Sequence, residues 1–186
     1  MSRVTSPKVL FDSLAGTWTL SRDLESANVN EPNGKCLGTA TFTSRQSSPV
    51  LDANGKLQVA EAEMLYHEQG EFQLPSMIKV PFSKKYVWKL SKSEDSKDGK
   101  ISVWFTKPGS EATDYLFHDI HISVTEGTNE PSLIQGSGGH LCVDDFYSTA
   151  YEFSTDLDER IQSWKTVHEV RGPKKDQVLT TNFSRG

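Results

Sequence analysis

An arginine lies on the apolar face of residues 16–23, the first segment of the chain with clear alternation. Side chains of a strand point alternately to its two sides, so Trp18, Leu20 and Arg22 share one face. A guanidinium stays protonated, and its burial without a partner is costly. Arg22 therefore needs either a carboxylate partner inside the protein or an anionic ligand.

Other polar side chains are placed in the same interior by the same argument. Tyr66 and Glu68 share one strand face with Ala62 and Met64. His118 shares a face with apolar neighbours at 116, 120 and 122. Residues 117, 119 and 121 are then expected to point outward. One face of a half-buried strand lines the core, so these polar groups are expected to line it too.

A hairpin is expected around residues 140–147. A four-residue turn would place Cys142 opposite Tyr147, His140 opposite Thr149, and residue 138 opposite Tyr151. Because opposed residues share a sheet face, His140, Cys142, Tyr147 and Tyr151 are expected on one side. A second hairpin turns at residues 171–176, which puts residues 179, 181, 183 and 185 on one face of the last strand.

This set of side chains supports more than one kind of chemistry. Arg22 and Glu68 can form a structural ion pair. Alternatively, the planar guanidinium of Arg22 can bind a ligand carboxylate, phosphate or enolate through two hydrogen bonds. Histidines with Glu and Tyr can act as general acids and bases. The catalytic candidates are His118, His140, Glu68 and Tyr147; the candidate ligand-binding residues are Arg22, Tyr66, Glu68, Tyr86, His118, His140, Tyr147 and Tyr151.

No cofactor and no metal site is predicted. A zinc site from His118, His140 and Glu68 lacks ligand spacing in the sequence, and haem with one axial histidine is the other alternative considered. Cys36 and Cys142 are expected to be free thiols, with Cys142 as a small buried side chain. The glycine-rich residues 136–139 precede a strand and are expected to form a turn or bulge, since a nucleotide loop precedes a helix.

Composition limits the classes of protein. The 186 residues fit one domain, 1–186, with residues 1–8 as a flexible tail; hydrophobic residues make up 35% and charged residues 24%, which is typical of a globular chain. No apolar run approaches a membrane span, and the polar N-terminus predicts a cytoplasmic protein. A net charge of −5 argues against nucleic-acid or anionic-membrane binding.

Alternation recurs along the chain, and helical periodicity is almost absent. About ten short strands are separated by Gly, Pro, Asn and Asp, which predicts an all-β, antiparallel up-and-down barrel of about 8–10 strands. A short helix is expected before the first strand, at residues 9–14, and another at 157–161.

Two resemblances support this fold. The start Gly16-Thr17-Trp18 and the terminal Arg185 resemble the calycin superfamily of lipocalins and fatty-acid-binding proteins. In that superfamily a first-strand Trp packs under an Arg of the last strand at the closed end of a barrel. The resemblance therefore implies a structural signature of Gly16, Trp18 and Arg185.

A closer resemblance covers nearly the whole chain. The sequence resembles domain of unknown function family 6314, a family of calycin-like barrels with no settled activity. The matching pieces are Leu14-Ala15-Gly16-Thr17-Trp18 with Arg22, Tyr66-x-Glu68-x-Gly70, Tyr86-x-Trp88, Phe117-His118, His140-Leu141-Cys142-x-x-Asp145-x-Tyr147, and Gly172–Asp176 followed by Thr181-x-Phe183-x-Arg185.

Three functions fit a barrel with this interior. The first is binding of a small, partly apolar, anionic organic ligand in the lumen, which needs an apolar cavity with one charged anchor. The second is a cofactor-independent isomerase, cyclase or hydratase, which needs His and Glu or Tyr converging at an open pocket mouth. The third is an accessory interaction protein, which predicts a filled core without a cavity.

Overall fold

A computed structural model describes residues 6–31, 33–52, 54–94, 99–124, 133–142, 144–156, 158, 160–173 and 175–185, except for the side chains of Val124 and Cys142. One helix, α1 (Pro7–Ser13), precedes the strands. The strands of the barrel are β1 (Gly16–Ser26), β2 (Gly34–Arg45), β5 (Ala62–Gln73), β6 (Lys79–Ser91), β7 (Lys100–Thr106), β8 (Thr113–Val124), β9 (Leu133–Cys142), β10 (Asp145–Thr155), β11 (Ile161–Arg171) and β12 (Asp176–Ser184); β3 (Val50–Leu51) and β4 (Leu57–Gln58) form a separate hairpin.

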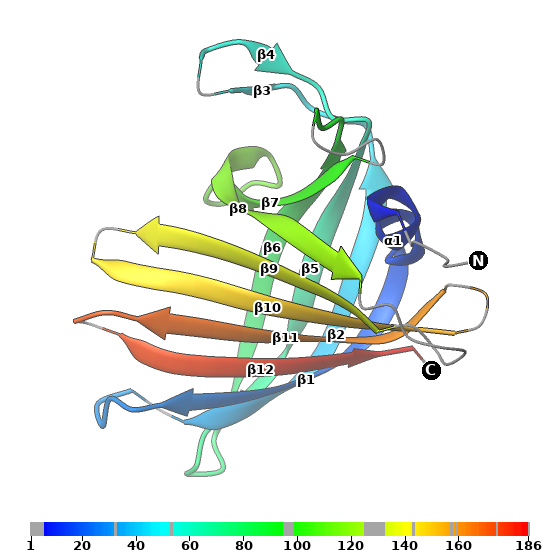
Figure 1. The fold of residues 1–186 in the computed structure, drawn as a ribbon. Coiled ribbons are helices and arrows are strands. Elements are labelled where there is room, and N and C mark those ends of the chain that lie inside the picture. Colours follow the sequence, from blue (N-terminus) through cyan, green and yellow to red (C-terminus); the bar gives the residue numbers. More distant parts are fainter. Residues whose placement is uncertain are drawn as a thin grey trace.

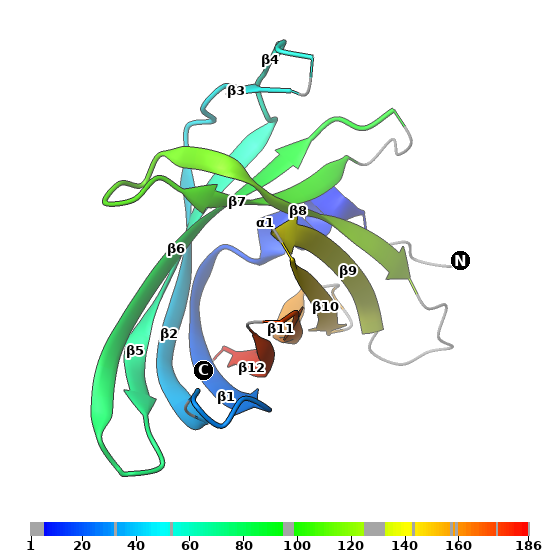
Figure 2. The same cartoon turned by 90° about the vertical axis from the view of Figure 1, so that its left-hand side faces the viewer.

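These strands form a closed antiparallel barrel (Figures 1 and 2). Each barrel strand pairs with its neighbours in sequence, β2 pairs with β5 across the inserted β3–β4 hairpin, and β1 pairs with β12 to close the ring. Figure 1 shows the β3–β4 hairpin projecting from the barrel. The all-β, up-and-down barrel with a short N-terminal helix is confirmed, with ten barrel strands in the described part of the chain.

The helix packs against the barrel through its apolar residues. Ser6 caps it by accepting a hydrogen bond from the Val9 backbone N–H at 3.2 Å, and Pro7 suits its first turn. Leu10 and Phe11 are buried. The helix thus begins two residues before the expected position. Pro7 and Lys8 belong to the helix, whereas the prediction placed both in a flexible tail. Residues 1–5 of that tail lie outside the described residues.

The second predicted helix is wrong at the residues the structure describes. Asp158 lies in a turn, and Ile161 begins β11. The Asp156 carboxylate accepts hydrogen bonds from the backbone N–H groups of Asp158 and Arg160, both at 2.9 Å. A short Asp side chain competes well for backbone donors, which favours a turn over a helix here. Leu157 and Glu159 lie outside the described residues.

Two local features of β8–β10 differ from the expectation. The glycine-rich residues 136–139 lie within β9 and not in a turn or bulge between strands. The β9–β10 hairpin is tighter by two residues, so that His140 pairs with Tyr147, and Asp145 with Cys142. A shift of two residues keeps each side chain on its predicted face, because the period of a strand is two.

A β-bulge in β8 corrects the orientation of Phe117. Val103 pairs with His118 and Trp104 with Leu116, so Phe117 is the extra residue of the bulge. Phe117 and His118 are both buried, whereas Leu116 is exposed. Simple alternation predicted an outward Phe117 and an inward Leu116, and it fails here because a bulge interrupts the period.

Candidate functional site

Arg22 and Glu68 form a bidentate ion pair inside the barrel. Arg22 Nη1 donates to Glu68 Oε1 and Nη2 to Oε2, both at 2.8 Å, and Nε donates to Thr181 Oγ1 at 2.7 Å. The side chain of Glu68 is 3% exposed and that of Arg22 is 15% exposed. The inward positions of β1, β5 and β12 bring the three residues together. The carboxylate partner of Arg22 is therefore inside the protein.

The carboxylate of Glu68 is fully engaged. Tyr66 donates its hydroxyl to Glu68 Oε2 at 2.6 Å. Burial opposes ionisation of Glu68, but the hydrogen bonds and charge of Arg22 outweigh it and lower the pKa of Glu68. Burial together with the neighbouring carboxylate raises the pKa of the Tyr66 phenol. At neutral pH this group of residues is a neutral ion pair with a protonated tyrosine.

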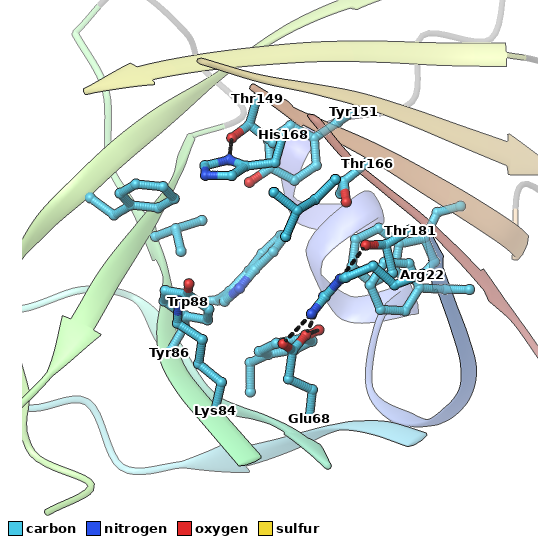
Figure 3. A pocket seen from close by; sticks show the side chains of 16 residues that line it. Arg22, Glu68, Lys84, Tyr86, Trp88, Thr149, Tyr151, Thr166, His168 and Thr181 are labelled. Atoms are coloured by element: carbon cyan, nitrogen blue, oxygen red, sulfur yellow. Dashed lines mark hydrogen bonds and ion pairs between the residues drawn. The ribbon is translucent and has the colours of Figure 1, made fainter. Parts of the chain in front are cut away.

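A cavity of about 130 Å³ lies against this ion pair (Figure 3). Its walls come from β1, β5, β6, β7, β8, β10, β11 and β12. Aromatic side chains make up the largest part of its lining, and they are Tyr66, Tyr86, Trp88, Phe117, Tyr151, Trp164 and Phe183. The Nε1 atom of Trp164 is buried and has no hydrogen-bond partner among the described residues. The lumen is therefore not completely filled by side chains.

Lys84 supplies a second cation to the cavity. It lies two residues before Tyr86 on β6, opposite Glu68 of β5, and it is exposed to solvent while it also lines the cavity. Its ammonium lies 5.2 Å from the centre of the Tyr86 ring. In the described part of the chain, no carboxylate oxygen lies within ion-pair distance of this ammonium. Figure 3 shows Lys84 and Glu68 on one side of the cavity, and Thr149 and His168 on the other.

His168 is a cavity residue that the sequence analysis did not identify. Its Nδ1 lies 2.7 Å from Thr149 Oγ1, and burial followed by the charges of Lys84 and Arg22 lowers its pKa to about 4. A signal for it was present. The hairpin expected at 171–176 pairs His168 with Leu179, and Leu179 lies on the inward face of the last strand. At neutral pH the imidazole is uncharged.

His118 is buried but does not line the cavity. Its Nε2 lies 2.7 Å from the hydroxyl of Tyr151, and burial lowers the pKa of His118 to about 3. Burial also raises the pKa of Tyr151. Gly138 makes room for the imidazole, because a Cβ at position 138 would lie 2.2 Å from His118 Cδ2. His118 is thus a hydrogen-bonded core residue that stays neutral at physiological pH.

His140 and Tyr147 lie side by side on β9 and β10, half-buried and outside the cavity lining. Their ring centroids are 6.3 Å apart, and the His140 ring also lies 5.8 Å from that of Phe117. Of the predicted ligand-binding residues, the cavity brings together Arg22, Tyr66, Glu68, Tyr86 and Tyr151, and it leaves out His118, His140 and Tyr147. The acid–base candidates therefore do not converge on one space.

The residues considered for zinc do not converge either. Glu68 is held by Arg22 and Tyr66, and His118 by Tyr151. Among the residues with described positions, no group of three His, Cys, Asp or Glu side chains is placed to hold a metal ion. Cys36 is a free, buried thiol, and burial raises its pKa; the side chain of Cys142 lies outside the description.

The end of the barrel near α1 has the contacts that the calycin resemblance implies. The Arg185 guanidinium carbon lies 4.1 Å from the centre of the Trp18 ring, and Nη2 donates to the Ala15 carbonyl at 2.9 Å. Trp18 Nε1 donates to the Leu14 carbonyl at 2.9 Å. Gly16 has φ of +110°, a conformation that side chains disfavour. These contacts fix the helix to the strands.

The family resemblance is confirmed by comparison with known proteins. The chain belongs to the Family of unknown function (DUF6314), whose model matches residues 14–185. Among solved structures, the chain is similar to the S-type phycobiliprotein lyase CPES from Guillardia theta, with 11% sequence identity and a TM-score of 0.44 over 100% of this chain and 94% of that chain. No curated protein sequence matches. No helix in the described ranges is long and apolar enough to cross a membrane.

Proposed function

We propose that this barrel binds a small, partly apolar organic anion in its lumen. The observation that carries the proposal is the charge of the cavity lining. Arg22 and Glu68 neutralise each other, His168 is uncharged, and Lys84 adds one positive charge that no carboxylate among the described residues pairs with. An anion whose apolar part enters the aromatic cavity would pair with that charge and bury its own apolar surface.

The proposal assigns the anchoring role to Lys84, not to Arg22. Arg22 directs both arms of its fork to Glu68 and its Nε to Thr181. A ligand that bound the Arg22 guanidinium in place of Glu68 would leave the Glu68 carboxylate buried without its partner, which is costly. The Lys84 ammonium pairs with no carboxylate in the described ranges, although Tyr86 and the more distant charge of Glu68 raise its pKa, and its exposed position allows an incoming anion to reach it.

The two alternatives from the sequence receive less support. Acid–base catalysis needs a group that titrates near neutral pH beside the reacting atoms. The pKa values of His118 and His168 are lowered to about 3 and about 4, and Glu68 is engaged by Arg22. An accessory interaction protein predicts a filled core, and the cavity does not favour it.

The proposal is tested by calorimetric titration with matched pairs of an anion and its neutral amide, hexanoate with hexanamide and benzoate with benzamide. The anion of at least one pair is expected to bind at least tenfold more tightly than its amide. Lys84→Met should abolish this preference, whereas Lys85→Met should keep it, because Lys85 pairs with Glu111 outside the cavity. Equal affinities within both pairs, or no binding of either anion, would overturn the proposal.

A further inference from the structure

The dimensions and polarity of the cavity restrict the ligand more closely. Resting on the proposed function, we infer that the ligand is a single-ring aromatic carboxylate that carries a hydroxyl group, with the carboxylate at Lys84, the ring between the aromatic walls and the hydroxyl at His168. Three features of the cavity support this ligand: its volume, the chemistry of its walls and the polar groups on its opposite sides.

The volume admits one ring. The cavity measures about 130 Å³. For comparison, an apolar protein cavity of roughly 150 Å³ accommodates benzene. A long alkyl chain or a fused ring system would extend out of this volume into solvent and lose part of its contact with the walls. Since Lys84 is also exposed to solvent, a carboxylate attached to the ring can remain at the mouth without occupying the enclosed volume.

The walls favour an aromatic ring over an aliphatic one. Trp88, Tyr86 and Phe117 line the cavity, and the rings of Tyr86 and Phe117 are stacked 6.0 Å apart, at an angle of 21°. Trp88 meets Tyr151 edge to face, with centroids 6.0 Å apart. Aromatic rings gain from offset or edge-to-face contacts beyond the area that they bury, so a flat ring ligand extends this arrangement.

The far side of the cavity offers a hydrogen-bond partner for a hydroxyl. Thr149 binds Nδ1 of His168, and no hydrogen bond joins Nε2 to another residue in the described ranges. A neutral imidazole has one donor and one acceptor nitrogen, and which of these Nε2 is depends on the tautomer. A hydroxyl group can donate or accept, so it suits either tautomer, whereas a second carboxylate would suit only the donor form.

Calorimetric titration with six probes tests the inference: 4-hydroxybenzoate, 3-hydroxybenzoate, benzoate, cyclohexanecarboxylate, octanoate and 2-naphthoate. One of the two hydroxybenzoates is expected to bind most tightly, at least tenfold more tightly than cyclohexanecarboxylate, octanoate and 2-naphthoate. His168→Phe should bring that hydroxybenzoate to the affinity of benzoate. His67→Phe is the matched control, since His67 is half-buried outside the cavity lining and bonded to Ser83, and it should change neither affinity.

The outcomes separate this inference from the proposed function. Octanoate or cyclohexanecarboxylate binding as tightly as the hydroxybenzoates, with dependence on Lys84, would overturn the aromatic ligand and leave the anion-binding lumen in place. A preference for the hydroxybenzoate that survives in His168→Phe would overturn the placement of the hydroxyl. Failure of all six anions to bind would overturn both proposals together.

Discussion

The guanidinium of Arg22 faces the carboxylate of Glu68 across the barrel interior, with two parallel hydrogen bonds of 2.8 Å. These residues come from β1 and β5, which do not pair with each other; β2 lies between them. The ion pair thus joins two strands that share no backbone hydrogen bonds. Its neutrality leaves Lys84 as the charge that a ligand in the lumen would meet.

Arg22→Met is expected to destabilise the protein by about 3–5 kcal/mol, because it leaves the buried Glu68 carboxylate without its partner. Chemical denaturation at pH 7 measures this change. The double variant Arg22→Met, Glu68→Met removes both charges and should recover most of the stability. A loss below about 1 kcal/mol in the single variant would show that the pair contributes little to folding.

Acidification should weaken the fold through the two buried histidines. The pKa values of His118 and His168 in the folded protein, about 3 and about 4, lie below the value of roughly 6.5 for an unfolded histidine. Below pH 6.5 the unfolded chain therefore binds protons that the folded chain does not, so the free energy of unfolding decreases as the pH is lowered. Above pH 6.5 the contribution of the two histidines to stability is constant. Each histidine is expected to remove roughly 1.5 kcal/mol between pH 6.5 and 5.

His118→Gln separates the two contributions. The variant keeps a hydrogen-bonding side chain beside Tyr151 but cannot titrate, so the loss of stability between pH 6.5 and 5 should fall by about half. His121→Gln, at an exposed position of the same strand, is the control and should leave the profile unchanged. An equally steep profile in His118→Gln would contradict a buried neutral His118. Denaturation series at several pH values provide the measurement.

Gly138→Ala should destabilise the protein by roughly 1–3 kcal/mol, because the added methyl group would collide with the His118 ring. The cost should largely disappear in a His118→Ala background, where the ring is absent. Gly139→Ala is the matched control: its added methyl would lie 3.2 Å from the ring of the exposed Phe146, which can move. Equal costs at the two glycines would contradict the packing described for His118.

The sequence was sufficient for the barrel and for part of the site. Alternation alone placed Arg22, Tyr66 and Glu68 inside, because β1 and β5 are regular throughout these positions. The predicted β9–β10 hairpin had a turn two residues longer than the observed one. His140 nevertheless kept its predicted face, because a register shift of two residues does not change the side to which a strand residue points.

The remaining differences have local physical causes. The bulge at Phe117 changes which residues of β8 point inward, and its position follows from pairing with β7, which a single strand does not reveal. Lys84 was missed because β6 extends to Lys79, well before the apolar run that starts at Tyr86. Arg22 pairs with Glu68 and not with a ligand because the two side chains lie close together inside the barrel. Strand periodicity predicts which face a residue occupies, but it does not predict distances between strands.

The tryptophans allow the most direct test of a ligand-binding lumen. Trp88 and Trp164 line the cavity, whereas the Trp18 indole bonds to the Leu14 carbonyl and the Trp104 indole bonds to Ser102. The measurement is a ¹H–¹⁵N NMR titration of the indole N–H signals with benzoate and, separately, hexanoate. At least one anion should shift the signals of Trp88 and Trp164, leave those of Trp18 and Trp104 in place, and lose this effect in Lys84→Met. Unchanged Trp88 and Trp164 signals with both anions, or equal shifts in Lys84→Met, would contradict an anion-binding lumen.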